Sequence, residues 1–453
     1  MIGKGWGAVH LLVLGLDQHT APLAVRERLS WDISDLSALL PPLLDRGLGE
    51  VALLCTCNRT EFYAVAQDPA TARQVLGEVL VSRSGLGAEE LEPLLYRFVG
   101  AEECARHLCR VAVGLESLVL GETQVLGQVK QAYLRSAEVG TVGVALHGLF
   151  HQVLAAAKRV HATTELAQAP VSVGAAAVDL ARRHLGELAG RRAVLLGAGE
   201  TAGTVARRLQ EAGLAELVVA NRTLEGARQL AASVGGRAAT LGDLPELLEG
   251  AHVVIASTAA KEPLVGSAAL AMRGPGAGPL LIVDIAVPRN VDPAVATLPG
   301  VLLCNIDDLE DVAAGGRRAR ARQAQAAETL IEEDVRRFVG WWRGRDAVPL
   351  IAALRQRFVD VAEAQAQELL RRLPGLTPAE QDLVRQASRR IAATLVHLPV
   401  QYVREQASTP QGVETVRVLA DAFALELPGL RSLPGGRERS QAAGEWPRGG
   451  KRA

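Results

Sequence analysis

Cys57 is the residue whose setting most clearly suggests covalent chemistry. It follows the apolar run VALL within the segment CTCNRTE, so the sequence predicts a thiol at the carboxyl end of a short strand. Arg59, two residues further along, is expected to lower the pKa of this thiol and raise its thiolate fraction. A thiolate attacks acyl carbon atoms, and hydride then reduces the thioester. A buried cysteine that only fills space is the alternative interpretation.

A glycine-rich segment supplies a second chemical signal. GAGETA follows the strand-like run AVLL and opens a helical pattern, which is the context that a dinucleotide-binding loop requires. Its first glycine would make the tight turn, its second would let backbone N–H groups approach a pyrophosphate, and the helix N-terminus would attract that anion. The predicted cofactor contacts are Gly197, Ala198, Gly199, Glu200, Thr201 and Ala202. A glycine turn that binds nothing is the alternative.

The end of the next strand indicates which nicotinamide cofactor to expect. The run LVVA ends at Asn221, Arg222 and Thr223, where an NAD enzyme usually places an acidic residue. Arg222 could pair with a 2′-phosphate, so the sequence favours NADP(H). A solvated arginine is the alternative.

Composition limits the class of protein. The chain has 453 residues, 49% hydrophobic and 22% charged, with a net charge of −1. At roughly 150 residues per domain, we expect about three domains, and the charge excludes a globally basic nucleic-acid binder. The five cysteines do not suggest a disulfide framework, and Cys55 and Cys57 are too close for a zinc site. The apolar run Leu11–Leu16 is too short to cross a membrane, so we expect a soluble cytoplasmic protein without a metal.

Patterning along the chain predicts an α/β multidomain protein. Residues up to about 155 mix short strands with helices, and residues 170–312 alternate strands and helices as in a doubly wound parallel sheet. From about residue 318 only helical patterns remain, and Thr377-Pro378-Ala379-Glu380 predicts a capped helix start. The apolar stripes of these helices predict a partner subunit. The tail 433–453 is predicted to be disordered.

Several ordered motifs resemble one enzyme family, glutamyl-tRNA reductase, over residues 11–430. They are GLDQHTAPLAVRE, CTCNRTEFY, GLESLVLGETQVLGQVKQAY, PVSVGAAAVDLA, LLGAGETAG, ANRT, DIAVPRNVDP and NIDDL. The resemblance implies NADPH-dependent reduction of glutamyl-tRNA(Glu) to glutamate-1-semialdehyde through a cysteine thioester, with release of tRNA. This is the first committed step of tetrapyrrole (porphyrin and haem) biosynthesis by the five-carbon route.

The resemblance also implies an architecture. It comprises an N-terminal catalytic domain (1–163), a Rossmann-like NADPH domain (164–316), and a long spinal helix with an all-helical dimerisation domain (317–432), in a V-shaped homodimer. A partnership with glutamate-1-semialdehyde aminomutase and feedback by haem are further expectations that no residue of the sequence demonstrates.

Site residues carried over from the family remain tied to that resemblance. Cys57 falls on the family's nucleophile, and His107 falls on its important histidine, which could position the ester or move a proton. The implied substrate contacts are Thr56, Asn58, Arg59, Ser117, Glu122, Thr123, Gln124 and Gln128.

One departure concerns Cys55, where the family usually has serine. Strand alternation would place Cys55 and Cys57 on one face, which suggests that the two thiols can share an oxidation product. Two other functions stay open from the residues alone: another NADPH-dependent oxidoreductase similar to shikimate dehydrogenase, and a non-enzymatic binding module. The first leaves CTCNRTE and GLESLVLGETQ unexplained, and the intact glycine loop argues against the second.

Overall fold

The computed structural model describes residues 9–118, 120–164, 166, 173–273, 278–407, 409 and 412–425. The predicted disordered tail, 433–453, lies outside these residues. The chain divides into two compact units, one of Leu11–Asp334 and one of Val335–Ala453 with Met1–His10. The domain limits predicted from the sequence stay predictions.

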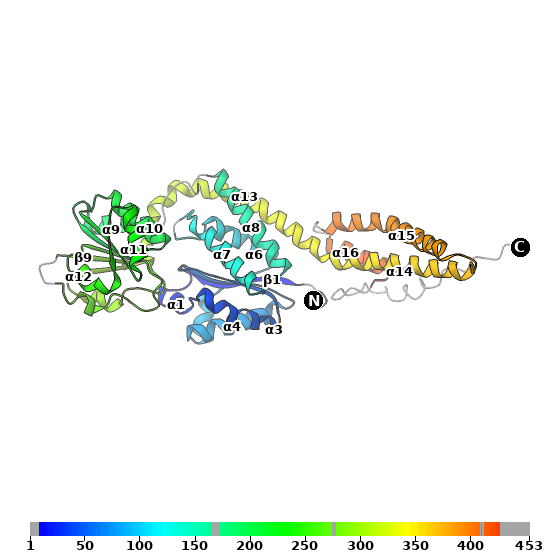
Figure 1. Ribbon diagram of the computed structural model, residues 1–453, viewed down its shortest axis with the longest axis horizontal. Helices are drawn as coiled ribbons and strands as arrows, with labels where there is room; N and C mark the ends of the chain where they lie inside the picture. The colour runs from blue at the N-terminus through cyan, green and yellow to red at the C-terminus, as the bar shows by residue number, and fades with distance from the viewer. Residues whose placement is uncertain are drawn as a thin grey trace. The chain divides into compact units, whose positions relative to one another are not determined.

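The first unit begins with a four-stranded sheet. Its strands lie in the order β2-β3-β1-β4, and β2 pairs antiparallel with β3, as β1 does with β4. The strands are β1 (His10–Asp17), β2 (Leu48–Cys55), β3 (Arg59–Ala66) and β4 (Tyr96–Val99). Every residue of β3 is buried because helices cover both faces of the sheet (Figure 1).

Two groups of helices make this cover. One group comprises α1 (Leu23–Arg28), α2 (Leu36–Leu39), α3 (Pro41–Asp45), α4 (Pro69–Ser84) and α5 (Ala88–Leu91). The other comprises α6 (Ala101–Val113), α7 (Gln124–Glu138) and α8 (Val144–Thr163). Helices α3 and α4 pack on the first face, and α6, α7 and α8 pack on the second (Figure 1).

A six-stranded parallel sheet follows in the same unit. Its order, β10-β9-β8-β5-β6-β7, is the doubly wound order in which the chain reverses direction between β5 and β8. The strands are β5 (Arg192–Leu196), β6 (Glu216–Asn221), β7 (Arg237–Thr240), β8 (Val253–Ala256), β9 (Leu280–Asp284) and β10 (Val301–Asn305). Cofactors of such sheets bind at the carboxyl ends of the strands beside this reversal.

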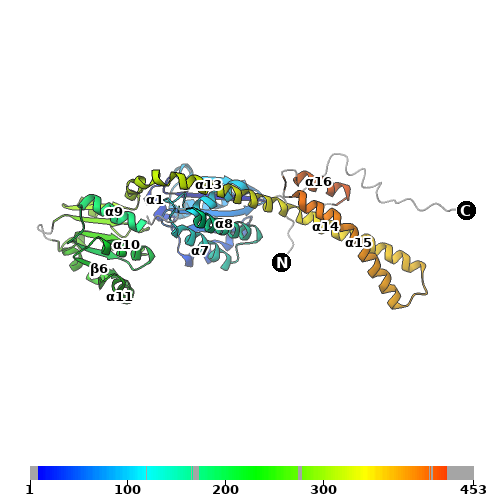
Figure 2. The same cartoon turned by 90° about the horizontal axis from the view of Figure 1, so that it is seen from above.

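Alternating residues of these strands bury two separate cores. Helices α9 (Val173–Leu185), α10 (Glu200–Glu211) and α11 (Leu224–Ser233), all labelled in Figure 2, cover one face. Helix α12 (Leu244–Glu249) covers the other. Leu195 belongs to the first core and its neighbour Val194 to the second. The period of two explains why the strands read as continuous apolar runs.

After β10 every secondary-structure element that the structure describes is helical. Helix α13 (Glu310–Asp346) is 37 residues long, and α14 (Val348–Arg372), α15 (Pro378–Ala407) and α16 (Gly412–Ala422) follow. The capping box at Thr377 is confirmed, because its N–H donates to Glu380 Oε2 at 2.8 Å and its Oγ1 accepts from the Glu380 N–H at 3.4 Å. The parallel six-stranded sheet and the helices that follow it confirm the predicted fold class. None of the helices described here is both long and apolar enough to cross a membrane.

Candidate active site

Cys57 lies at the tip of a tight turn between β2 and β3. The Thr56 N–H donates to the Arg59 carbonyl at 2.8 Å, and Thr56 Oγ1 accepts from the N–H groups of Asn58 and Arg59, both at 3.2 Å. Strand β2 ends at Cys55, so strand alternation does not reach Cys57. Cys55 packs against the core of the four-stranded sheet, and Cys57 packs against the core of the six-stranded sheet. The expectation that both thiols face one side is therefore wrong.

A small cavity of about 60 Å³ opens beside the Cys57 turn. All the predicted catalytic and substrate-contact residues line it except His107 and Thr123. Thr201 and Ile285 of the six-stranded sheet's domain complete the wall, so both sheets contribute to one cavity. The lining residues are Thr56, Cys57, Asn58, Arg59, Ser117, Glu122, Gln124, Val125, Gln128, Val173, Thr201 and Ile285.

A larger cavity of about 480 Å³ adjoins the first and shares Gln124, Gln128 and Thr201 with it. Thr123, Glu200 and Cys55 lie in its wall with Trp31 and Arg135. Thr123 is therefore close to the predicted site but outside the cavity at Cys57.

The Cys57 thiol is protonated at neutral pH in this arrangement. Burial and, after it, the negative charge of Glu122 raise the pKa of the thiol to about 12. The cation that counteracts them is Arg26, whose positive charge lowers the pKa. The sequence-based expectation that Arg59 activates Cys57 is wrong, because Arg59 pairs with Glu61 instead.

Glu122 has the protonation behaviour of an acid–base group. Burial raises the pKa of its carboxyl to about 7, with a smaller contribution from the charge of Glu200, while the Val173 N–H, 3.5 Å from Glu122 Oε1, partly offsets them. Glu122 and Cys57 line the same cavity, and the charge of Glu122 disfavours ionisation of the thiol. Above about pH 7 the carboxyl is ionised while the thiol is still protonated, so the carboxylate can act as a general base toward the thiol.

A buried polar cluster next to the cavity fixes the position of Arg59. Its Nη1 donates to Glu61 Oε1 at 2.7 Å and its Nη2 donates to the Glu116 carbonyl at 2.5 Å. Glu61 is fully buried and also accepts from Tyr96 at 2.6 Å and Tyr63 at 2.5 Å. Burial alone would raise the pKa of Glu61, but His107 and Arg59 together hold it well below its usual range.

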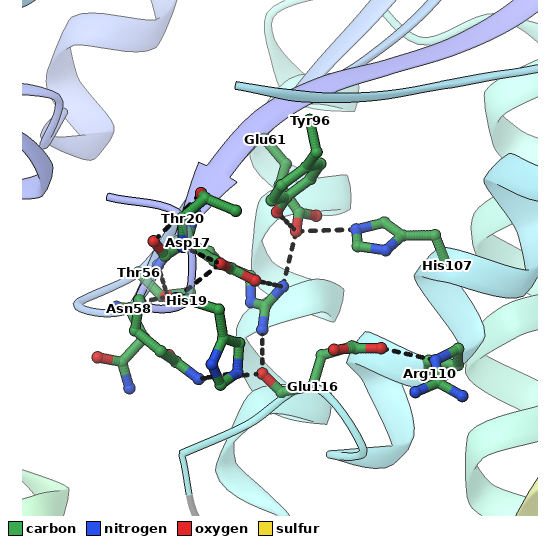
Figure 3. Close-up of polar contacts among 12 residues, drawn as sticks. Asp17, His19, Thr20, Thr56, Asn58, Glu61, Tyr96, His107, Arg110 and Glu116 are labelled. Atoms are coloured by element: carbon green, nitrogen blue, oxygen red, sulfur yellow. Dashed lines mark hydrogen bonds and ion pairs between the residues drawn. The ribbon is translucent and has the colours of Figure 1, made fainter. Parts of the chain in front are cut away.

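His107 belongs to this cluster rather than to the cavity wall. Its Nε2 lies 3.0 Å from Glu61 Oε1 (Figure 3). Its ring stacks on Phe98 with 4.5 Å between ring centroids. Glu61 thus stands between His107 and Arg59. The structure gives His107 the geometry of a positioning residue, without the direct contact to an ester that the sequence suggested.

Two residues of the site were missed by sequence reasoning. For Glu61 a signal existed, since Arg59, Glu61 and Tyr63 alternate along β3 and must share one face. Arg26 had no comparable signal. It is only 3% exposed, and its Nη1 donates to the Cys57 carbonyl at 3.0 Å, across a sequence separation that no local pattern shows.

The glycine loop has the shape that the sequence predicted. Gly197 has φ +109°, and a Cβ there would lie 2.2 Å from the Ser257 carbonyl oxygen, so only glycine fits. A Cβ on Gly199, the residue before α10, would meet no atom within 4 Å. Packing of the chain thus leaves the space beside Gly199 open, as a pyrophosphate at the α10 N-terminus would require.

The end of β6 lies beside this loop. A Cβ on Gly226 would be 2.8 Å from Asn221 Nδ2 and 3.8 Å from the Ala198 Cβ, which brings the two segments together. Asn221 Nδ2 donates to Thr223 Oγ1 at 3.2 Å and so closes the turn after the strand. Arg222 between them is exposed.

The remaining cysteines are structural in character. Cys104, Cys109 and Cys304 are buried, as expected, and all five thiols are free. Among the described residues, no three histidine, cysteine or acidic side chains are grouped as a metal site.

Three family models match successive parts of the chain. One described as glutamyl-tRNAGlu reductase, N-terminal domain, matches residues 14–164, and one described as the dimerisation domain of the same enzyme matches residues 326–425. Between them, a model of shikimate / quinate 5-dehydrogenase matches residues 179–312. Together with the glycine loop, this middle match indicates a domain for a nicotinamide cofactor.

Relatives are similar over nearly the whole chain. A protein from Geobacillus kaustophilus named glutamyl-tRNA reductase is 38% identical over 423 residues, covering 92% of this chain and 92% of that protein. One of the same name from Chloroflexus aggregans is 39% identical over 439 residues, covering 92% and 96%. A solved structure of glutamyl-tRNA reductase from Methanopyrus kandleri is 31% identical, with a TM-score of 0.48 over 92% of this chain and 99% of that one.

Proposed function

Since this chain belongs to the glutamyl-tRNA reductase family, we propose that it reduces glutamyl-tRNA(Glu) to glutamate-1-semialdehyde and releases the tRNA. This is the first committed step of tetrapyrrole biosynthesis by the five-carbon route. The observation that carries the proposal is the shared cavity, in which Cys57 and Glu122 lie together with Thr201 of the cofactor domain.

The first step is acyl transfer to Cys57. Glu122 accepts the thiol proton, and the Cys57 sulfur attacks the glutamyl ester carbon. The ester C–O bond breaks, a proton from the solvent or Glu122 reaches the ribose oxygen, and the tRNA leaves with a free hydroxyl. The glutamyl group remains as a thioester on Cys57.

The cavity wall suits a glutamyl group. Arg59 supplies a cation for its side-chain carboxylate, and the contacts with Glu61 and the Glu116 carbonyl fix the orientation of that guanidinium. Ser117 and Gln128 add polar groups to the same wall. Thr56 stabilises the Cys57 turn, because its hydroxyl oxygen accepts hydrogen bonds from two backbone N–H groups there.

The cofactor assigned to the second step is NADPH. When bound, its nicotinamide supplies the hydride that reduces the thioester carbonyl to the aldehyde and frees the Cys57 thiol. The open space at Gly199, the α10 N-terminus and the exposed Arg222 all fit a dinucleotide with a 2′-phosphate. Thr201 would lie on the cofactor side of the cavity.

The C-terminal helices support a homodimer. Ile391, Leu395, Leu398 and Tyr402 of α15 are all exposed and recur at helical spacing, so they form one apolar face. The dimerisation-domain match covers this helix. Association with glutamate-1-semialdehyde aminomutase and a cytoplasmic location stay predictions.

The alternative of an oxidoreductase similar to shikimate dehydrogenase is not favoured. That family model covers only residues 179–312 and leaves the Cys57 turn and the Glu61 cluster without a role. The two functions separate in one assay. Purified protein with glutamyl-tRNA and NADPH should yield deacylated tRNA and aldehyde in equal amounts, and NADPH oxidation should slow as salt weakens tRNA binding. Reduction of dehydroshikimate without any aldehyde from glutamyl-tRNA would overturn the proposal.

A further inference from the structure

Arg26 joins three segments that are distant in sequence. Its Nε donates to the Ala21 carbonyl at 3.2 Å, and its Nη1 donates to the Cys57 carbonyl at 3.0 Å and to Asn58 Oδ1 at 3.2 Å. Its Nη2 forms an ion pair with Asp307. Arg26 is almost completely buried, whereas the Asp307 side chain is 41% exposed. A buried guanidinium with this many partners has a fixed position.

Arg26 stabilises one side of the Cys57 turn through its hydrogen bonds. Thr56 closes the turn internally, but residues 56–58 belong to neither β2 nor β3 and lack the ladder bonds of a strand. The Arg26 contacts to Cys57 and Asn58 therefore fix where the thiol points. Shifting a reacting atom by about 1 Å can lower a rate by roughly a hundredfold.

The other end of Arg26 reaches the cofactor domain. Asp307 follows β10, and its N–H donates to Asn305 Oδ1 at 2.7 Å. The next residue of α1, Glu27, contacts the same domain with the opposite charge, because it accepts from Arg289 Nε at 2.8 Å and from the Arg289 N–H at 2.7 Å. Arg26 therefore binds the segment that follows β10, and its neighbour Glu27 binds the segment that follows β9.

The contacts of Arg26 and Glu27 cross between the two domains that wall the cavity. The cavity wall comes from both domains, so opening it separates residues that Arg26 and Glu27 now connect. Without Asp307, the positive charge of Arg26 would act on the Cys57 turn without a counter-charge.

We propose that Arg26 is a positioning residue that holds the Cys57 turn and activates the thiol when Asp307 withdraws, so that domain separation favours acyl transfer. The inference rests on the proposed role of Cys57 as nucleophile. Besides Arg26, burial, Glu122 and Cys55 act on the thiol and oppose its ionisation, whereas a backbone hydrogen bond at Cys57 favours it. Asp307 regulates the thiol only through Arg26.

Alkylation of Cys57 by iodoacetamide at several pH values tests this proposal, with the labelled residue identified by mass spectrometry. Asp307→Asn should move the midpoint of the Cys57 alkylation profile down by about one pH unit, which is about tenfold faster labelling at a fixed pH. Asp308→Asn removes the same charge one residue away and has no contact with Arg26, so its profile should match that of the native protein. Arg26→Gln should move the midpoint up, and the double variant Arg26→Gln/Asp307→Asn should lose the effect of Asp307→Asn.

Single-turnover acyl transfer without NADPH supplies a second readout. Arg26→Gln should lower the rate constant by roughly tenfold to a hundredfold and leave the half-saturating concentration of glutamyl-tRNA nearly unchanged. A profile for Asp307→Asn identical to that of Asp308→Asn would overturn the proposal, even if Arg26→Gln fails to fold. Native protein that alkylates as expected but forms no glutamyl thioester would refute the proposed function and not the action of Arg26 on the thiol.

Discussion

Glu61 Oε1 lies 3.0 Å from His107 Nε2, and the same oxygen accepts from Arg59 at 2.7 Å. The histidine is thus connected to the cavity through one buried carboxylate. Replacing His107 would therefore disturb the position of Arg59 first, and any effect on proton transfer would be secondary. His107, which the sequence predicted to be catalytic, therefore supports Arg59, the residue proposed to bind the substrate carboxylate.

Replacing Glu61 by glutamine should destabilise the protein and abolish activity. The substitution removes the nearer buried counter-charge of Arg59 and leaves only Asp17, 4.0 Å away; breaking such a buried pair typically costs about 3 kcal/mol or more in the free energy of unfolding. The pKa of Glu61 is lowered on folding, so its stabilisation is fully present at pH 7, begins to decline as the pH falls below about 4.5, and is lost only at a much lower pH. Urea unfolding at pH 7 measures the loss.

Glu78→Gln is the matched control for that experiment. Glu78 is exposed and pairs with Arg46 on the surface, where ion pairs contribute little. It should unfold like the native protein. Equal stabilities of the two variants would contradict the role given to Glu61.

Glu122→Gln should remove general-base catalysis. In the native protein the rate of acyl transfer should rise with pH through about 7, because Glu122 accepts a proton only when ionised. The variant should be slower by roughly a hundredfold or more at pH 8 and should lack the step near pH 7. Rapid-quench measurement of the glutamyl thioester across pH gives both values. Glu138→Gln, on an exposed site of α7, should keep the native profile.

Two glycine substitutions should separate folding from cofactor binding. Gly197→Ala places a Cβ against the Ser257 carbonyl at a positive φ, so the thermal midpoint should fall. Gly199→Ala meets no atom within 4 Å, so its thermal midpoint should stay near the native value while NADPH affinity drops. Calorimetry and a fluorescence titration with NADPH distinguish them. Native NADPH affinity in Gly199→Ala would mean that the pyrophosphate does not bind there.

Arg222→Ala should reduce the preference for NADPH over NADH. A charge-assisted contact to a phosphate contributes about 1.5–3 kcal/mol, which is roughly tenfold to a hundredfold in the ratio of the two dissociation constants. NADH affinity should stay nearly constant, since it lacks the 2′-phosphate. An unchanged ratio would show that Arg222 is only a solvated side chain.

The sequence alone predicted those parts of the site that follow from local patterns. The glycine loop after β5, the strand end at Asn221 and the capping box at Thr377 each depend on neighbours within a few residues, and each lies where expected. The order of the parallel strands follows from repeated strand–helix units. Cys57 stood out because its motif combines an apolar strand with a polar turn.

The protonation states could not be predicted in this way. The neighbour of Cys57 in sequence, Arg59, proved to be paired with Glu61, whereas the distant Arg26 is the cation that acts on the thiol. The pKa of Glu122 is raised mainly because its surroundings exclude water, with a smaller contribution from the charge of Glu200. Such effects depend on burial and on partners tens of residues away, which periodicity does not reveal.

The most direct test of the account compares native protein with Cys57→Ser and Cys55→Ser, using glutamyl-tRNA labelled in its glutamyl group. Without NADPH, the native protein and Cys55→Ser should each retain label as an acyl-enzyme, and adding NADPH should convert it to aldehyde. Cys57→Ser should bind NADPH normally yet retain no thioester and oxidise no NADPH. Full turnover by Cys57→Ser, or label retained on Cys55, would contradict the central role of Cys57.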